Sequence, residues 1–325
     1  MTGLRAEAAE PRLITLDDIE AARERISPHV RATPIVAMNP SGLRLKAENL
    51  QPIGAFKLRG AFNALLSLPA EVRARGVVAH SSGNHAQAVA YAAARLGVRA
   101  TIVMPGNAPA PKIEGVRREG AEIVAVGAGS TERAEMARKL SAERGVALIA
   151  PFDMDEIMCG TGTIGLEILE QAPDVQAVFA PVSGGGLLGG LAAAIKLSRP
   201  LVRVIGVEPE LASDAYQSFK SDRVVTISAE QASSTLADGL RVQQLGERTW
   251  PHIRAFVDEI VTVSEDAMRA AMRRIAAEAR LVAEPSGAVS AAGALTHGGD
   301  LSRSVAVLSG GNVDLALFAA ILAEG

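Results

Sequence analysis

The chain has 325 residues, of which 48% are hydrophobic and 21% are charged. This length favours one large α/β unit or two lobes that share a cleft, and the composition excludes extended disorder and small stapled scaffolds. A formal net charge of -3, with Lys and Arg scattered among acids, makes nucleic acid a poor partner. The single cysteine, Cys159, excludes internal disulfides and suits a reducing compartment, so we expect a cytoplasmic protein.

The N-terminal residues carry no apolar core of a secretory signal, because acids alternate there with Arg5 and Arg12. No uncharged stretch reaches the roughly 18 apolar residues that a membrane helix needs. We therefore expect no contact with a membrane.

Short β-branched runs alternate with longer stretches of helical period from about Leu43 onward, which is typical of parallel sheets with crossover helices. The pattern predicts an α/β fold with strands at 43–47, 76–80, 100–103, 122–126, 147–149, 177–181, 202–207, 259–263 and 305–308. The clearest predicted helices are 84–96, 111–119, 131–144, 164–170, 187–197, 265–279 and 313–323. The simplest division is a small lobe of residues 76–151 inserted in a large lobe of residues 1–75 and 152–325.

Four polar turns fall after predicted strands, at residues 81–85, 183–186, 238–239 and 309–312, and of these 238–239 is the weakest as a strand end. In parallel sheets, the loops at the carboxyl ends of the strands line the ligand crevice. The turns therefore indicate one shared site, which we expect between the lobes.

The glycines Gly184, Gly185 and Gly186 stand between a predicted strand and a predicted helix. Backbone N–H groups at such a helix start suit a phosphate, although a tight turn with close packing would use the same glycines. Lys57 lies between Phe56 and Leu58 just before a helix, where partial burial would lower its pKa and make it a nucleophile. The alternative is an ordinary exposed lysine.

The turn around Asn84 offers hydroxyls, a carboxamide, an imidazole and helix N–H groups. These donors match a carboxylate, but ordinary helix capping would also explain them.

Four motifs resemble, in order and content, the pyridoxal-phosphate enzymes of the tryptophan-synthase-β fold type, in the branch of threonine/serine dehydratases and serine racemases. They are AFKLRGA at 55–61, SSGNHAQ at 81–87, SGGGL at 183–187 and SGGNVD at 309–314. The resemblance spans nearly the whole chain. It implies a two-lobed parallel-sheet fold and pyridoxal 5'-phosphate as cofactor.

This resemblance implies that Lys57 holds the cofactor aldehyde and later removes the Cα proton of the substrate. Ser309 would face the pyridine nitrogen, and a neutral hydroxyl there favours β-elimination over transamination. The other implied cofactor contacts are Phe56 against the ring, Asn84 on the ring hydroxyl, Gly239 and Glu284 beside the ring, and Ser183, Gly184, Gly185, Gly186 and Leu187 around the phosphate.

The substrate implied by the resemblance is a 3-hydroxy amino acid, L-threonine or L-serine, which would be converted to a 2-keto acid and ammonia. Its carboxylate would be bound by Ser81, Asn84 and His85. Ser82 would also line this site, and in serine racemases the matching serine can return a proton to the face opposite the lysine. Racemisation and 3-hydroxyaspartate dehydration therefore remain alternatives.

Two further features concern charge. The segment 208–218 is similar to the divalent-cation site of serine racemases, which implies Mg²⁺ or Ca²⁺ at Glu208, Asp214 and the carbonyl of Ala212, although an exposed acidic turn is the alternative. Arg133 aligns approximately with an arginine that, in racemase-like relatives, can bind a second substrate carboxylate. Arg241 is a rival for this role. The alternative is that Arg133 is an ordinary exposed arginine. Related enzymes are homodimers or homotetramers, and the sequence does not choose between them.

Overall fold

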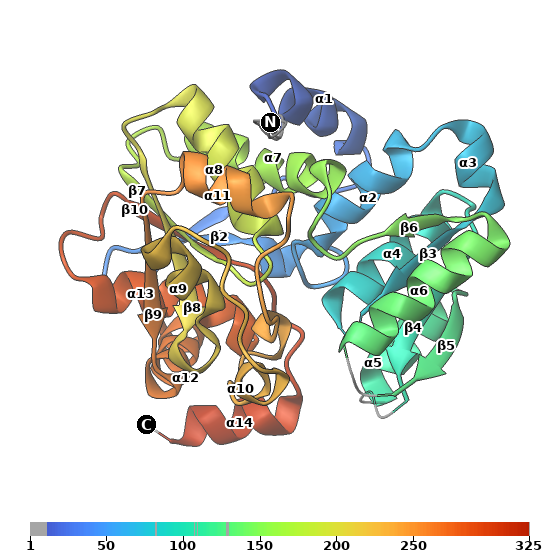
Figure 1. The fold of residues 1–325 in the computed structure, drawn as a ribbon. Coiled ribbons are helices and arrows are strands. Elements are labelled where there is room, and N and C mark those ends of the chain that lie inside the picture. The colour runs from blue at the N-terminus through green and yellow to red at the C-terminus, as the bar shows by residue number, and fades with distance from the viewer. Residues whose placement is uncertain (1–11, 82, 107, 109, 128–129, 325) are drawn as a thin grey trace, which may run out of the picture.

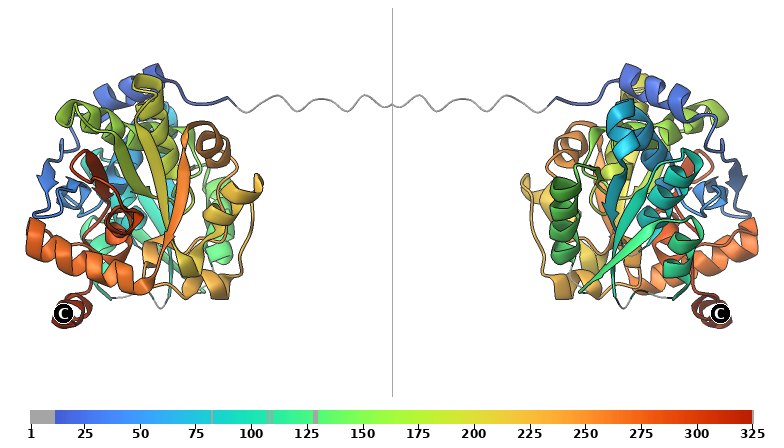
Figure 2. Two further views of the ribbon diagram at one scale, coloured as in Figure 1. Left: turned by 90° about the vertical axis from the view of Figure 1, so that its left-hand side faces the viewer. Right: turned by 90° about the vertical axis from the view of Figure 1, so that its right-hand side faces the viewer.

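The computed structural model describes residues 12–81, 83–106, 108, 110–127 and 130–324. Within these residues the strands form two sheets, and Figure 1 shows them side by side, the larger on the left and the smaller on the right. Figure 2 shows the same molecule from the side of each sheet. The α/β class expected from the sequence is confirmed.

The larger sheet has the strand order β1-β2-β10-β7-β8-β9. All neighbouring strands run parallel except β1, which pairs with β2 in the antiparallel sense. Its strands are β1 (Ile35–Ala37), β2 (Arg44–Ala47), β7 (Ala177–Pro181), β8 (Arg203–Pro209), β9 (Glu259–Val263) and β10 (Ser304–Leu308).

The smaller sheet is parallel throughout, in the order β5-β4-β3-β6. Its strands are β3 (Val77–His80), β4 (Ala100–Pro105), β5 (Glu122–Val126) and β6 (Ala147–Ile149). This sheet lies inside the predicted small lobe of residues 76–151, whose boundaries stay a prediction.

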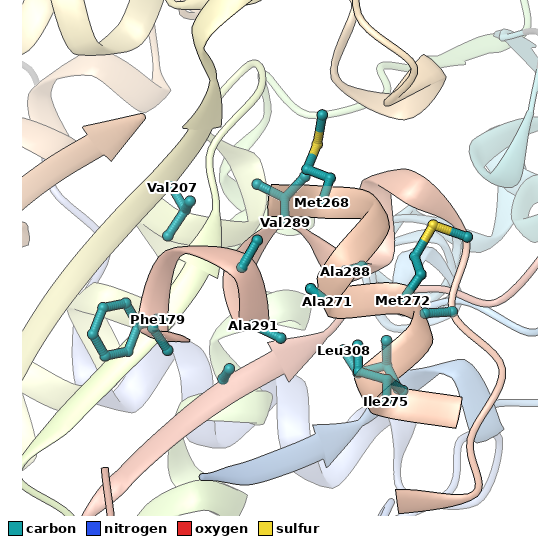
Figure 3. Close-up of a cluster of buried hydrophobic side chains, with 14 of the residues drawn as sticks. Phe179, Val207, Met268, Ala271, Met272, Ile275, Ala288, Val289, Ala291 and Leu308 are labelled. Atoms are coloured by element: carbon teal, nitrogen blue, oxygen red, sulfur yellow. The ribbon is translucent and has the colours of Figure 1, made fainter. Parts of the chain in front are cut away.

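Successive residues of a buried strand face opposite sides, and both faces of the larger sheet are apolar and covered by helices. Phe179 and Leu308 belong, with Met268 and Met272, to one cluster of buried apolar side chains on one side of the sheet, which Figure 3 shows. On the other side, the alternate strand residues pack against residues of α7, α8, α9 and α11, whose bounds follow. The helices around this sheet are α1 (Leu16–Ile26), α7 (Asp155–Gln171), α8 (Gly186–Ser198), α9 (Asp214–Ser221), α10 (Ala229–Ser233), α11 (Thr249–Phe256), α12 (Glu265–Arg274), α13 (Pro285–His297) and α14 (Leu315–Ala323).

Short turns and the remaining helices complete the described chain. The turns are η1 (Glu48–Leu50), η2 (Glu210–Ala212), η3 (Asp238–Leu240) and the π-helical η4 (Ile275–Ala279). The smaller sheet packs on α2 and α4 on one face and on α6 on the other. The helices of this part are α2 (Lys57–Ser67), α3 (Ala70–Arg75), α4 (Asn84–Arg95), α5 (Ala110–Arg118) and α6 (Ser130–Arg144).

All nine predicted strands are present close to their predicted bounds, but β1 was not predicted. Helix α7 is much longer than the predicted 164–170, because its first half contains glycines that the sequence pattern does not favour. A Cβ on Gly160 would lie 2.6 Å from the Arg59 carbonyl oxygen, and one on Gly162 would lie 3.0 Å from that of Gly190. Close packing on α2 and α8 therefore outweighs the poor helix propensity of these residues.

No helix among the described residues is long and apolar enough to cross a membrane.

Candidate active site

A cavity of about 200 Å³ lies where the two sheets meet. His80 ends β3, Ser183 follows β7 and Ser309 follows β10, and all three residues line it. The carboxyl ends of strands from both sheets therefore open into one space, as expected for ligand sites of parallel sheets. The structure thus brings the polar turns predicted from the sequence together.

Lys57 is the first residue of α2, and its side chain lines this cavity. Its Nζ donates a hydrogen bond to the Pro151 carbonyl oxygen at 2.7 Å and lies 5.1 Å from the centre of the Phe56 ring. Burial lowers the pKa of Lys57 to about 8. A larger share of this amine is unprotonated near neutral pH than for an exposed lysine, so it can act as a nucleophile or base.

The turn before Lys57 is held against the strand on the other side of the cavity. Phe56 donates its backbone N–H to the Ser309 carbonyl at 3.0 Å, and Gly311 donates to the Gly54 carbonyl at 2.9 Å. Gly54 has a φ of +73°, which is costly for other residues, so glycine is required at this turn. These contacts set where α2 begins and hence where the amine lies.

The segment Ser183 to Leu187 connects β7 to the start of α8, whose first N–H groups lack partners within the helix. A Cβ on Gly184 would lie 2.5 Å from the Phe152 ring, so the packing requires glycine there. Gly185 has a φ of +91° and does not line the cavity, whereas Ser183, Gly184, Gly186 and Leu187 do. The segment can therefore hold an anion such as a phosphate.

Asn84, at the start of α4, links the two parts of the molecule across the cavity. Its Nδ2 donates to Glu284 Oε1 at 2.6 Å, and its Oδ1 accepts from Asn312 Nδ2 at 2.9 Å. Burial and the nearby Asp238 carboxylate raise the pKa of Glu284 to about 7. Ser81, another predicted site residue, lines the cavity and accepts the Gly83 N–H at 3.1 Å.

Ser309 and Gly239 lie together at the far wall of the cavity. Ser309 is buried, and its hydroxyl donates to the Ser286 carbonyl at 3.5 Å. Gly239 donates its N–H to Ser286 Oγ at 2.8 Å and accepts from the Ser183 hydroxyl at 3.3 Å. Ser286 was not singled out from the sequence, although it stands in the segment that follows Glu284.

His85 is buried at the second position of α4. Its Nε2 lies 3.1 Å from the Ile149 carbonyl, which can only accept, so this nitrogen carries the proton. Burial and the nearby Lys57 lower the pKa of His85 to about 3, and its Nδ1 is buried without a hydrogen-bond partner. The neutral ring thus offers no second donor, and a carboxylate contact would come from its backbone N–H.

Several charged side chains of the cavity wall come from distant parts of the chain. Arg133 is half-buried and lines the cavity, whereas Arg241 lines it but donates to the Thr235 carbonyl at 3.0 and 2.7 Å. Lys112 and Asp238 also line it. Asp238 stands in the polar turn 238–239 that the sequence had indicated, whereas no sequence signal had pointed to Lys112. Ser82, predicted to be catalytic, lies outside the described residues.

The predicted cation site lies outside this cavity. Asp214 is buried, and neither of its carboxylate oxygens has a hydrogen-bond partner, while Glu208 Oε2 accepts the Tyr216 N–H at 2.8 Å. Burial and the Asp214 carboxylate raise the pKa of Glu208, and burial raises the pKa of Asp214 to about 7. Ala212 is buried in η2 beside them in sequence. Two unbalanced carboxylates fit a hard divalent cation.

A lysine amine with a lowered pKa, a glycine-rich segment that can hold an anion and a cavity between two largely parallel sheets suit an enzyme whose cofactor carries an anionic group and a carbonyl. The family model of the pyridoxal-phosphate dependent enzymes matches residues 26–310. The chain belongs to this family of pyridoxal-phosphate dependent enzymes. Its two-sheet fold is that of the tryptophan-synthase-β-like members.

Named relatives cover nearly the whole chain. The chain is 41% identical to an L-threo-3-hydroxyaspartate ammonia-lyase of Saccharomyces cerevisiae, over 95% of this chain and 96% of that protein. It is 42% identical to a serine racemase of Arabidopsis thaliana, over 91% and 92%. Among solved structures, a T.th. threonine deaminase superposes with a TM-score of 0.87 at 45% identity, covering 93% of this chain and 99% of the other.

Proposed function

We propose that this protein is an ammonia-lyase that converts a 3-hydroxy amino acid, L-threonine or L-serine, to a 2-keto acid and ammonia. The observation that carries the proposal is the Lys57 amine, with its pKa lowered to about 8, in the same cavity as the anion cradle and the Ser309 hydroxyl. The similarity to a threonine deaminase and to a hydroxyaspartate ammonia-lyase supports it.

Bound pyridoxal phosphate supplies an electron sink for the bonds at the substrate Cα. Lys57 would bind the cofactor aldehyde, and Ser183 to Leu187 would hold its phosphate through backbone N–H groups and the start of α8. The Lys57 amine, when free, would act as the base that removes the Cα proton of the substrate. The Ser309 hydroxyl carries no negative charge that would keep the ring nitrogen protonated, which supports elimination.

A substrate carboxylate would lie at the start of α4, where the N–H groups of Asn84 and His85 and the positive helix end are available. Ser81 and Ser82 would add hydroxyl donors, although Gly83 already donates to Ser81. Phe56, Asn84, Gly239 and Glu284 would surround the ring, as the sequence motifs imply.

A second candidate is the dehydration of 3-hydroxyaspartate. Arg133 lines the cavity, and a guanidinium suits a second carboxylate. The relative from S. cerevisiae carries this activity in its name. Racemisation, the activity in the name of the Arabidopsis relative, is the third outcome to be measured.

We also propose that Glu208, Asp214 and the Ala212 carbonyl bind Mg²⁺ or Ca²⁺. The support is the pair of buried Asp214 oxygens without partners beside a second carboxylate. The small mobile domain of residues 76–151, the homodimer or homotetramer and the cytoplasmic location stay predictions.

The test is a panel of enantiopure serine, threonine and 3-hydroxyaspartate, with keto acid and opposite enantiomer measured in parallel. We expect keto acid from L-threonine or L-serine in excess over any racemisation. Lys57→Ala should abolish the visible absorption band of the bound cofactor together with the activity. A holoenzyme that forms no keto acid from any member of the panel would refute the proposed function.

Within the same panel, Arg133→Ala separates the two lyase candidates. If the arginine binds a second carboxylate, the variant loses activity on 3-hydroxyaspartate alone. An equal loss on threonine rejects that role for Arg133.

A further inference from the structure

An ion pair joins the two sides of the cavity. Lys112 Nζ of α5 lies 2.5 Å from Asp238 Oδ2 of η3, and both residues line the cavity. Asp238 belongs to the part built on the larger sheet, since its neighbour Gly239 bonds to Ser183 and Ser286. Lys112 belongs to the part built on the smaller sheet.

The Lys112 ammonium also lies over the start of α4. A Cβ on Gly83, the residue just before this helix, would be 3.6 Å from Lys112 Nζ. Lys112 further lowers, and Asp238 raises, the pKa of Glu284, which accepts a hydrogen bond from Asn84. The ammonium therefore acts on the centre of the site rather than on its outer rim.

A lysine ammonium has three donors. One of them is directed to Asp238, and its side chain is 22% exposed, so it can make further bonds on the cavity side. Arg241, another cation of the wall, already donates twice to the Thr235 carbonyl. Lys57 is needed for the cofactor and for proton transfer.

We infer that Lys112 binds the α-carboxylate of the substrate at the start of α4, with Asp238 as the positioning residue that orients its ammonium. The inference rests on the proposed function for the place of the carboxylate. Nothing in the sequence motifs assigns a role to Lys112. In this role Lys112 is a specificity residue. It selects amino acids, which carry a carboxylate charge, over amines and amides, which do not.

The test measures the binding of glycine and of glycinamide to the holoenzyme by titration calorimetry. Glycine has no β-substituent, so no elimination occurs and binding is read directly. The variants are Lys112→Met, which removes the charge, and Lys112→Arg, which keeps it. Lys139→Met, which removes a 64% exposed lysine of α6, is the matched control.

We expect Lys112→Met to weaken glycine binding about 10-fold or more, since charge-assisted hydrogen bonds contribute at that level. Glycinamide binding should change less than about 2-fold, because the partner charge is absent. Lys112→Arg should restore most of the glycine affinity, and Lys139→Met should change neither ligand.

Equal weakening for glycine and glycinamide would overturn the inference, because it would mean that the ion pair only holds the two sides together. Unchanged glycine binding in Lys112→Met would overturn it as well. Failure of the proposed function is a different result, namely a wild-type holoenzyme that binds glycine but forms no keto acid from any 3-hydroxy amino acid.

Discussion

Two groups of buried charged side chains differ in how their charges are balanced. In the Arg59 cluster, which comprises Lys46, Glu48, Arg59 and Glu167, two cations face two anions. Arg59 Nη2 donates to Glu48 Oε1 at 2.8 Å and Arg59 Nη1 to Glu167 Oε1 at 2.6 Å, while Lys46 Nζ lies 2.5 Å from Glu167 Oε2. The Asp214 pair, Glu208 and Asp214, is equally buried but has two like charges and two oxygens without partners.

The difference separates a structural cluster from a candidate cation site. In the Arg59 cluster the carboxylate charges are balanced by protein, and the pKa of Glu48 stays below its ordinary value because of Arg59 and Lys46 despite burial. Among the residues that the structure describes, no cation forms an ion pair with the carboxylates of the Asp214 pair, and the pKa of Asp214 rises to about 7. A buried charge needs a partner, so the second group requires a proton or a metal ion.

The largest effect on the free energy of unfolding is expected from breaking the Arg59 cluster. Arg59→Met leaves Glu48 and Glu167 buried without this cation and should lower the free energy of unfolding by about 3–5 kcal/mol. Denaturant unfolding of the holoenzyme measures it. Arg203→Met, which breaks an exposed pair with Glu259, is the control and should cost less than about 1 kcal/mol. Equal effects in the two variants would contradict the comparison.

A divalent cation bound to the Asp214 pair should stabilise the folded protein. At a Ca²⁺ or Mg²⁺ concentration of about 100 times the dissociation constant, the gain is roughly 2.7 kcal/mol, read as a rise in Tm over protein treated with a chelator. Asp214→Asn should abolish this gain. If the variant keeps the full response to the cation, the ion binds elsewhere.

The Asp214 pair should also make the stability of the protein depend on pH, and the raised pKa of Asp214 fixes the direction of that change. The folded pKa of Asp214, about 7, lies above its ordinary 3.8, so folding favours the protonated carboxyl. This contribution to the stability of metal-free protein is lost as the pH rises from about 4 through about 7. Saturation with the cation should remove that slope, and Asp214→Asn should remove the part that comes from Asp214 and leave the part that burial of Glu208 contributes. Tm values at pH 5 and pH 7.5 suffice for the measurement.

Glu284 is intermediate between the Arg59 cluster and the Asp214 pair. Its carboxylate accepts one hydrogen bond, from Asn84, and its pKa is raised from 4.5 to about 7. Glu284→Gln imitates the protonated carboxyl, so its stability should match that of the wild type at pH 5. By pH 8 the variant should be more stable by about 1–3 kcal/mol, because the wild type must then hold a buried anion. Glu143→Gln, at an exposed residue of α6, should show no such gain. A constant difference at both pH values would contradict the assignment.

The sequence predicted the strands better than the helices. Buried parallel strands are continuous apolar runs between turn residues, and such runs are visible locally. Helix α13 was not predicted, since it is buried along almost its whole length and shows no alternation of apolar and polar faces. Strand β1 was missed because it has only three residues at a sheet edge.

The residues of the candidate site likewise fall into those that a local motif predicted and those that it did not. Lys57, Asn84, Ser183 and Ser309 were found because each stands in a short motif after a strand or before a helix, and the structure brings all four to one cavity. Lys112 stands in no motif. Its role depends on α5 lying against a turn that follows 126 residues later, and no local pattern encodes that contact.

By itself, the sequence predicted the alternation of strands and helices and a glycine-rich turn that suits an anion, because these depend on neighbouring residues, and the resemblance of its motif to the family singled out Lys57 as the residue that would bind the cofactor. Only the tertiary structure decided which charges are balanced. Arg59 and Glu167 are 108 residues apart, and the two unpartnered oxygens of Asp214 are evident only once burial is known. Charge balance in the interior is a property of contacts between distant segments, and folding creates those contacts and removes the water that would otherwise screen them.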